Sequence, residues 1–157
     1  MNLNCIFYFE SIYQSFLLSY YLNVLNRKGN KMLFEKILYK SFYLLKIKIR
    51  ENPYLIFFEN IEKSKPVLSI KFKIKTKKKN KQIIIVPIYI NLIKQYKKVI
   101  KWLELSLIIQ GVKNKYFIKL FYELIDLYFN NESFMLKKKN ENYKFIVLNK
   151  FNKNYRW

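Results

Sequence analysis

The sequence predicts a mainly α-helical protein, in which a six-helix domain carries a protruding two-stranded β-hairpin between its third and fourth helices. Two observations predict this architecture. Apolar residues recur at helical spacing through most of the chain, and they change to strict alternation only within a hairpin region at about residues 66–90. With 157 residues, 52% of them hydrophobic, the chain suits one domain with a packed core. We therefore expect a single domain over residues 1–157, in which residues 1–15 have no assigned role.

The ends of the first three helices are marked by residues that stop or start a helix. We expect helices over residues 10–26 and 31–48, separated by Gly29, which accommodates the left-handed backbone common just after a helix. The pair Asn52-Pro53 combines an N-cap residue with proline at the first helical position. It predicts a short third helix that ends near residue 63.

The hairpin follows the third helix. Apolar residues alternate with lysine from Ile70 to Lys75, which is typical of a strand, and a polar turn covers residues 77–81. A β-branched run then extends to Ile90 and contains Pro87. Because proline donates no backbone hydrogen bond, it suits an edge strand.

Helical spacing returns in the last part of the chain. We expect helices over residues 92–109, ending at Gly111, over residues 114–130, and from residue 134 to residue 151. The apolar positions of the helix over 114–130 follow one stripe closely, which predicts that it packs against the others.

The composition argues against an enzyme. The chain has no His, which removes the most common general base, and its single Cys rules out a cysteine zinc cluster. No glycine-rich phosphate loop is present, and Glu123 and Asp126 have Lys119 nearby, so we expect them to form surface ion pairs. We predict no catalytic residue, no metal site and no cofactor. A nuclease would need metal-binding carboxylates near the basic region, and residues 63–103 have none.

The positive charge is concentrated in part of the chain. Lys and Arg number 31 against 10 acidic residues, giving a net charge of +21, and 28 of the 31 are Lys. Residues 63–103 hold thirteen Lys and no acid, and seven of those Lys lie within residues 71–81. Like charges side by side on a hairpin destabilise it unless a polyanion compensates. We therefore predict that the hairpin binds nucleic acid.

Three groups of lysines are candidate phosphate contacts, because lysine clusters bind phosphate without reading sequence. The first lies on the hairpin, the second on one face of the fourth helix, and the third at the start of the last helix. The groups are Lys71, Lys73, Lys75, Lys77, Lys78, Lys79 and Lys81; Lys94, Lys97, Lys98 and Lys101; and Lys137, Lys138 and Lys139.

Several short motifs follow one another in an order that is more specific than any one of them. They are Gly29-Asn30-Lys31, Glu35-Lys36-Ile37-Leu38-Tyr39, Val86-Pro87-Ile88-Tyr89-Ile90, Lys101-Trp102, Lys137-Lys138-Lys139 with Glu141, Asn149-Lys150-Phe151 and Asn154-Tyr155-Arg156-Trp157. In this order, over residues 16–157, the chain resembles the small-subunit ribosomal protein 7 family in its bacterial and organellar form. The final motif is similar to that family's Tyr-Arg-Trp signature.

The resemblance implies a structural constituent of the small ribosomal subunit. Such a protein binds the 3′ major (head) domain of small-subunit rRNA, organises head assembly beside neighbouring head proteins, and directs its hairpin toward the exit-site tRNA and the mRNA path. It also adds Lys28, Lys31, Lys150, Arg156 and Trp157 to the expected RNA contacts. The family's hairpin tip has a Gly pair that residues 75–85 lack, so the conformation of the tip stays open.

The location and one alternative function also follow from composition. Lys, Asn, Ile, Phe and Tyr make up 94 of the 157 residues, and these types have AT-rich codons, which favours an organellar gene. We expect a ribosome-bound protein of the mitochondrial matrix, with the plastid as the alternative. Residues 3–25 are apolar for nearly the length of a membrane span, although polar residues interrupt them. The alternative function is therefore a basic peripheral or N-terminally anchored membrane protein of an organelle.

Overall fold

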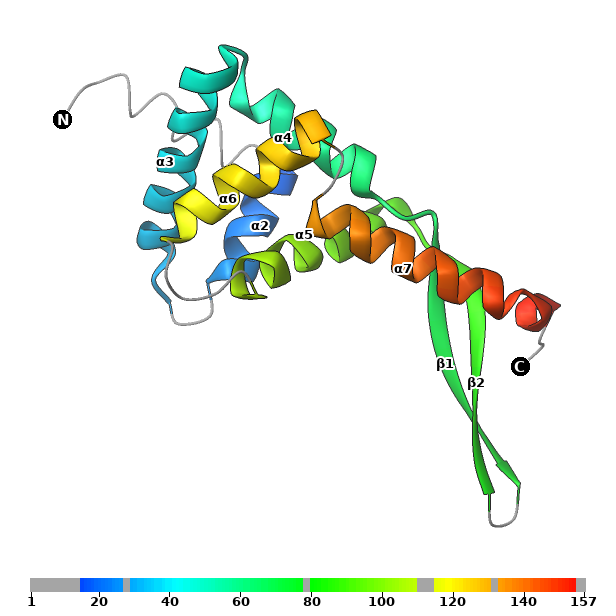
Figure 1. Cartoon of the computed structure of the whole chain (residues 1–157). Helices are drawn as coiled ribbons and strands as arrows, with labels where there is room; N and C mark the ends of the chain where they lie inside the picture. The colour runs from blue at the N-terminus through cyan, green and yellow to red at the C-terminus, as the bar shows by residue number, and fades with distance from the viewer. Residues whose placement is uncertain (1–14, 27–28, 78–79, 110–114, 131–132, 155–157) are drawn as a thin grey trace.

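The computed structural model describes residues 15–26, 29–77, 80–109, 115–130 and 133–154 (Figure 1). Within them, six α-helices and a hairpin between the third and fourth of these helices confirm the predicted fold class. The helices and strands in chain order are α2 (Phe16–Leu25), α3 (Lys31–Ile49), α4 (Pro53–Ser64), β1 (Leu68–Lys77), β2 (Asn80–Tyr89), α5 (Leu92–Ile109), α6 (Tyr116–Ile125), the π-helix η1 (Asp126–Asn130), α7 (Phe134–Leu148) and the 3₁₀-helix η2 (Lys150–Asn154).

The predicted stop and start signals act as expected. Gly29 has a φ of 78° in the left-handed region, between α2 and α3. Asn52 caps α4, because its side-chain Oδ1 accepts a hydrogen bond from the Tyr54 N–H at 3.0 Å, and Pro53 is the first residue of the helix. Arg50 adopts a φ of 64° after α3, so a non-glycine residue makes this turn.

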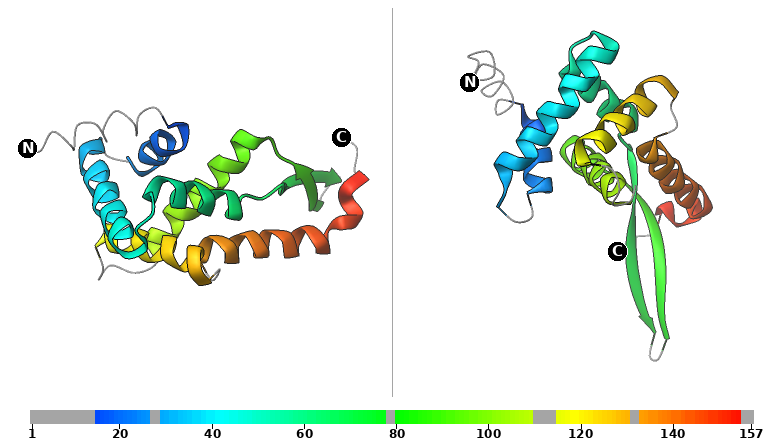
Figure 2. Two further views of the ribbon diagram at one scale, coloured as in Figure 1. Left: turned by 90° about the horizontal axis from the view of Figure 1, so that it is seen from above. Right: turned by 60° about the vertical axis from the view of Figure 1, so that its left-hand side comes forward.

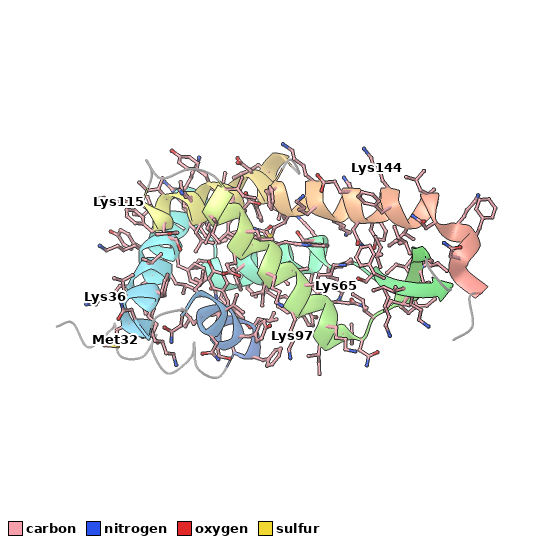
Figure 3. The ribbon with its side chains drawn as sticks, turned by 90° about the horizontal axis from the view of Figure 1, so that it is seen from below. Met32, Lys36, Lys65, Lys97, Lys115 and Lys144 are labelled. Atoms are coloured by element: carbon pink, nitrogen blue, oxygen red, sulfur yellow. The ribbon has the colours of Figure 1, made fainter. Side chains whose placement is uncertain are left out.

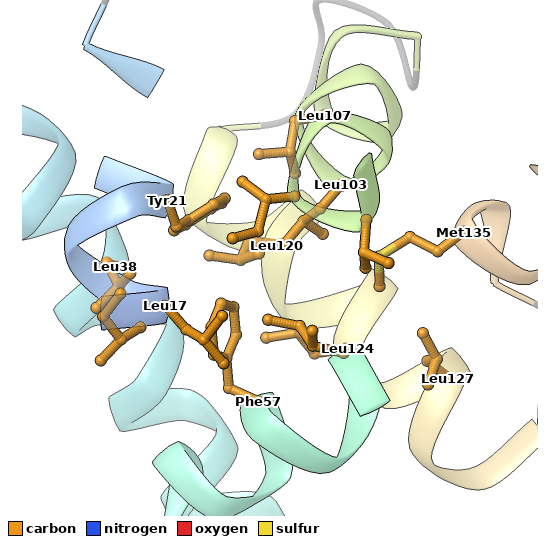
Figure 4. Packing of buried hydrophobic residues seen from close by; sticks show 14 of the residues in the cluster. Leu17, Tyr21, Leu38, Phe57, Leu103, Leu107, Leu120, Leu124, Leu127 and Met135 are labelled. Atoms are coloured by element: carbon orange, nitrogen blue, oxygen red, sulfur yellow. The ribbon is translucent and has the colours of Figure 1, made fainter. Parts of the chain in front are cut away.

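The core lies between helices α2 to α6, with α7 contacting it at one end. Side chains from all six helices meet there (Figure 4). Members of this cluster are Leu17, Tyr21, Leu38, Phe57, Leu103, Leu107, Leu120, Leu124 and Met135. Burying large aliphatic and aromatic side chains contributes about 1.5–3 kcal/mol each, so this cluster is the main source of stability of the body.

The hairpin projects from this helical body as an arm (Figures 1 and 2). Its strands are antiparallel, from the pair Leu68 and Tyr89 at the base to the pair Lys77 and Asn80 near the tip. Pro87 pairs with Ile70. Because the sheet has only two strands, each is an edge strand, and the missing donor of Pro87 is tolerated there.

The helix predicted over residues 114–130 changes its geometry in the structure. It is α-helical only to Ile125 and continues as the π-helix η1. The Asn60 side chain, buried in α4, donates from Nδ2 to the Leu124 carbonyl at 2.9 Å. A side chain that bonds to a helix carbonyl at such a point is a recognised accompaniment of a local change in helix type. Residue 114, expected to cap this helix, lies outside the described residues.

The expectation that Glu123 and Lys119 form surface pairs is wrong. Glu123 is 1% exposed and accepts a hydrogen bond at Oε1 from the Met135 N–H at 3.1 Å. Lys119 is 5% exposed, and its ammonium donates to the Leu107 carbonyl at 3.1 Å. Both side chains lie on the face of α6 that packs on other helices, and backbone groups far along the chain satisfy them.

The apolar N-terminal region belongs in part to the core. Leu17, Leu18, Tyr21 and Leu22 of α2 are buried among the other helices. Across the described residues, no helix is both long and apolar enough to cross a membrane. Residues 3–14 of the candidate span lie outside the described part of the chain.

Candidate nucleic-acid interface

Two hairpin lysines with described side chains lie on one face of β1. Lys71 and Lys73 are two positions apart, so they point to the same side of the strand. Partial burial and the adjacent Lys71 ammonium lower the pKa of Lys73. A bound phosphate would relieve this repulsion between two cations.

The rest of the predicted hairpin group is described only in part. The backbones of Lys75, Lys77 and Lys81 lie in β1 and β2, and their side chains are not described. Lys78 and Lys79 lie outside the described residues, as do Lys28, Arg156 and Trp157.

The lysines of α5 fall into two kinds. Lys94, Lys97 and Lys101 are exposed, as a basic helix face requires. Lys97 also lies with its Nζ 5.5 Å from the centre of the Tyr20 ring. Figure 3 shows Lys97 and Lys144 at opposite edges of the molecule in that view.

Lys98 makes contacts within the protein. Its ammonium donates to Ser69 Oγ at 2.6 Å and to Asn142 Oδ1 at 3.2 Å, and it lies 5.3 Å from the centre of the Trp102 ring. Partial burial lowers the pKa of Lys98. This residue therefore links α5 to β1 and α7, and it fixes the direction in which the hairpin leaves the body.

The three lysines at the start of α7 also differ from one another. Lys137 is exposed, whereas Lys138 pairs with Glu141 at 2.7 Å. Lys139 donates to the carbonyl of Lys63 at 2.5 Å, near the end of α4, and partial burial lowers its pKa. Cations at the C-terminal end of a helix satisfy its unpaired carbonyls, so Lys139 joins α7 to α4.

The remaining described candidates lie at opposite ends of the chain. Lys31 is the first residue of α3 and is partly exposed. Lys150, in η2, is exposed, and its Nζ lies 5.5 Å from the centre of the Phe151 ring.

Polar side chains from the C-terminal helices hold the base of the hairpin, and the sequence had not singled them out. Asn142 donates from Nδ2 to the Leu68 carbonyl at 3.0 Å, and the Tyr143 hydroxyl accepts from the Val67 N–H at 3.1 Å. Asn152 donates to the Ile85 carbonyl at 3.0 Å. No sequence signal pointed to these side chains, because their partners lie 67 to 76 positions away along the chain.

A second polar cluster lies where α4 leads into the hairpin. Glu62 pairs with Lys65 at 2.5 Å and accepts a hydrogen bond from the Tyr96 hydroxyl on α5. Burial opposes ionisation of Glu62, but the hydrogen bonds from Lys65 and Tyr96 outweigh it and lower the pKa of this carboxyl. The cluster therefore fixes the segment that enters β1.

Nothing in the described part of the chain provides a catalytic or metal-binding constellation. Those residues hold no group of three or more His, Cys, Asp or Glu placed to bind a metal ion. An open groove of about 320 Å³ between α3 and α6 is lined by Tyr39, Lys40, Tyr43, Leu44 and Phe117. None of these supplies a nucleophile beside a general base.

Comparison with known proteins adds the decisive observation. Residues 4–150 match the family model described as ribosomal protein S7p/S5e, which covers most of the chain. The chain belongs to the ribosomal protein S7p/S5e family. This confirms the resemblance carried by the motifs, and membership makes the chain a structural ribosomal protein instead of an enzyme.

Relatives in this family are similar over most of their own length. The small ribosomal subunit protein uS7 of Carsonella ruddii (strain PV) is 32% identical over 90% of this chain and 87% of its own length. The proteins of the same name from Desulfatibacillum aliphaticivorans and Thermodesulfovibrio yellowstonii are 29% and 30% identical, over 94% and 92% of this chain and 91% and 89% of their own lengths. The S7 relatives support a structural constituent of the small ribosomal subunit.

Proposed function

We propose that this S7 family member binds the 3′ major (head) domain of small-subunit rRNA and organises assembly of the head. Its hairpin arm lies near the exit-site tRNA and the mRNA path, and its body contacts neighbouring head proteins. The RNA contacts are the candidate lysines named above, together with Arg156 and Trp157. This goes beyond family membership, because it assigns a domain of the rRNA and a direction for the arm.

One observation carries the proposal: a hairpin within an acid-free, lysine-rich segment projects from a folded body. Residues 63–103 contain thirteen lysines and no acid, and Lys71 and Lys73 are adjacent on one face of β1. An isolated two-stranded hairpin is only marginally stable in water, and repulsion between its lysines opposes it further. Phosphates around the arm remove that repulsion.

The contacts of the individual lysines refine this assignment. Exposed Lys71, Lys94, Lys97, Lys101 and Lys137 are the ammonium groups that we propose contact phosphate directly. Lys98 and Lys139 hydrogen-bond within the chain, so we propose that they mainly position the arm and α7.

The test is the salt dependence of binding to an RNA transcript of the head domain. Replacing Lys77, Lys78, Lys79 and Lys81 with Gln removes four charges from the tip. Each lost phosphate contact lowers the slope of log K against log salt by about 0.7–0.9. We expect the slope to fall by up to about 3 if all four lysines contact phosphate.

The control removes the same charge elsewhere. Lys36, Lys40, Lys46 and Lys48 are exposed on α3, and their replacement with Gln leaves the hairpin intact. We expect this variant to keep most of the slope. An equal fall in both variants would mean that net charge, and not the arm, determines binding, and an unchanged slope in the tip variant would contradict the proposal.

We also propose a ribosome-bound location in the mitochondrial matrix. The AT-rich codon set behind the lysine and asparagine content supports an organellar gene. The named relatives are bacterial, so they support a ribosome of bacterial type without distinguishing the compartment. Sequencing the gene in its genomic context tests this: a mitochondrial position supports it, and a plastid or bacterial chromosomal position would contradict it.

A further inference from the structure

The two faces of the hairpin differ in the charge that their β1 side chains carry. Side chains alternate along a strand, and residues paired across an antiparallel ladder point to the same side. One side, the lysine face, carries Ser69, Lys71 and Lys73 of β1 beside Ile84, Val86 and Ile88 of β2. The other side, the apolar face, carries Leu68, Ile70, Phe72 and Ile74 of β1 and Ile85, Pro87 and Tyr89 of β2.

The body covers the base of the lysine face but leaves Phe72, Ile74 and Tyr89 of the apolar face exposed. Ser69 accepts a hydrogen bond from Lys98, and Val86, which pairs with Lys71, is 2% exposed. On the apolar face, Phe72 is 67% exposed, Ile74 is 66% exposed and Tyr89 is 73% exposed. Large apolar side chains side by side on an exposed ribbon are typical of a protein-binding surface, and uncovered they promote aggregation.

The chemistry of the apolar face fits a protein better than RNA. Nucleic acids are held by cations on phosphates and by rings on bases. Among the seven described side chains of this face, none is charged, and five are leucine, isoleucine or proline, which offer neither hydrogen bonds nor an aromatic ring on which a base stacks. Aliphatic and aromatic groups without charge match the central part of a protein interface.

The surrounding charge selects the kind of protein. A second copy of the chain would bring its own +21 charge and its own thirteen lysines against the same arm. A partner whose apolar strip is bordered by carboxylates would instead be attracted by the positive charge that the chain carries as a whole. Charge complementarity therefore favours an acidic partner over self-association.

We infer that the apolar face of the hairpin is a docking surface for another small-subunit protein that presents an apolar strip bordered by Asp and Glu. This rests on the proposed function, since the lysine face on rRNA leaves the opposite face of the arm for a protein. The arm then holds RNA on one face and protein on the other.

The first experiment places a photo-crosslinking benzoylphenylalanine at Phe72 of the full chain. The variant is incorporated into small subunits reconstituted from purified rRNA and total small-subunit proteins. The matched control is the same group at Tyr43, which is also 67% exposed but lies on α3. We expect position 72, and not position 43, to crosslink to a peptide that contains apolar residues and carboxylates. A crosslink from position 72 only to RNA or to a second copy, or none, would overturn the inference.

The second experiment separates this inference from the proposed function. F72S/I74S removes two anchors from the apolar face, and we expect about tenfold weaker retention of the crosslinked protein with an unchanged affinity for the naked head-domain transcript. We expect K71Q/K73Q to have the reverse effect: the affinity for the transcript falls, and the crosslinked protein is retained. A loss of transcript affinity in F72S/I74S, or full retention of the protein, would overturn the inference. An unchanged transcript affinity in K71Q/K73Q would count against the RNA assignment of the lysine face alone. Circular dichroism of each variant checks that the helical body is intact.

Discussion

At the scale of single residues, neighbouring lysines of one sequence cluster have different roles. Lys97 and Lys98 are adjacent on α5, yet Lys97 is exposed and Lys98 bonds to β1 and α7. Adjacent side chains on an α-helix point about 100° apart. Lys137 and Lys139 differ in the same way, since Lys137 is exposed and Lys139 bonds to the Lys63 carbonyl. Charge alone therefore identifies a basic cluster, and the direction of each side chain decides which members are available to a ligand.

The different contacts of Lys97 and Lys98 predict that a substitution at Lys98 affects stability, whereas a substitution at Lys97 affects RNA binding. Lys98→Ala removes the hydrogen bonds to Ser69 and Asn142, and we expect it to lower the free energy of unfolding by about 1–2 kcal/mol. Lys97→Ala should change stability by less than about 0.5 kcal/mol while weakening binding to the head-domain transcript. Urea unfolding and filter binding measure the two quantities. Equal stability of the two variants would contradict the role assigned to Lys98.

Glu123 is a second residue whose role depends on a distant contact. Its carboxylate accepts from the Met135 N–H in the first turn of α7, where backbone donors lack partners within the helix. A negative charge at that end also interacts favourably with the helix dipole. Glu123 thus acts from α6 as a cap for α7.

We expect Glu123→Ala to destabilise the protein by about 2 kcal/mol, because it leaves a buried N–H without its acceptor. Glu123→Gln keeps an oxygen acceptor, so we expect it to lower the stability by less than Glu123→Ala does. Glu141→Ala is the control, since that residue makes an exposed pair with Lys138 worth little. Thermal unfolding of the three variants tests the order, and an Ala variant of Glu123 as stable as that of Glu141 would contradict it.

At the scale of elements, the hairpin is anchored by polar groups from several helices. Asn142, Tyr143 and Asn152 bond to backbone groups near its base, and Lys98 bonds to Ser69. The cluster of Glu62, Lys65 and Tyr96 fixes the segment before β1. Hydrogen bonds are directional, so they set the angle of the arm more narrowly than apolar contacts would.

The lowered pKa of Glu62 predicts a pH dependence at this base. Because the folded-state pKa lies below the unfolded value, ionised Glu62 stabilises the fold at neutral pH. This contribution is lost as the pH falls from about 4.3 through the lowered pKa. We expect Glu62→Gln to lower the urea midpoint at pH 7 and to match the unsubstituted protein at about pH 3. A difference between the two proteins that persists at the lower pH would contradict this.

At the scale of the whole molecule, a charge of +21 on 157 residues opposes the compact state. Internal ion pairs cannot offset this charge, because the chain has only 10 acidic residues for its 31 basic ones. Some lysines, such as Lys97 and Lys98, lie over aromatic rings. In the function that we propose, bound RNA supplies the missing negative charge. Folding and binding are therefore coupled through electrostatics.

This coupling predicts opposite responses to salt. Raising NaCl from roughly 50 to 200 mM screens repulsion, so we expect the Tm of the free protein to rise. Over the same range the affinity for the head-domain transcript should fall steeply, because counterion release weakens with salt. Thermal melts and binding titrations on one preparation measure both. A free-protein Tm that falls with salt would show that self-repulsion is not the dominant electrostatic effect.

Much of the fold could be predicted from local signals. Gly29, Asn52 and Pro53 act within a few residues of their own position, and alternation from Ile70 to Lys75 depends only on strand geometry. The change of α6 into η1 could not be predicted, since the Asn60 side chain that bonds Leu124 lies 64 positions earlier in the chain.

By itself the sequence determined the six helices, the hairpin, the excess of lysine around it and, through the order of its motifs, the family. Tertiary structure decided which charged groups are free. Lys119 and Glu123 are buried, and Lys98 and Lys139 hold the arm and α7, through partners 12 to 76 residues away. The reason is physical: periodicity records the face of a helix or strand on which a residue lies, whereas the neighbour of that face depends on how the elements pack. The open apolar face of the hairpin is the clearest case, since alternation predicted it and only the packed body revealed that it stays uncovered.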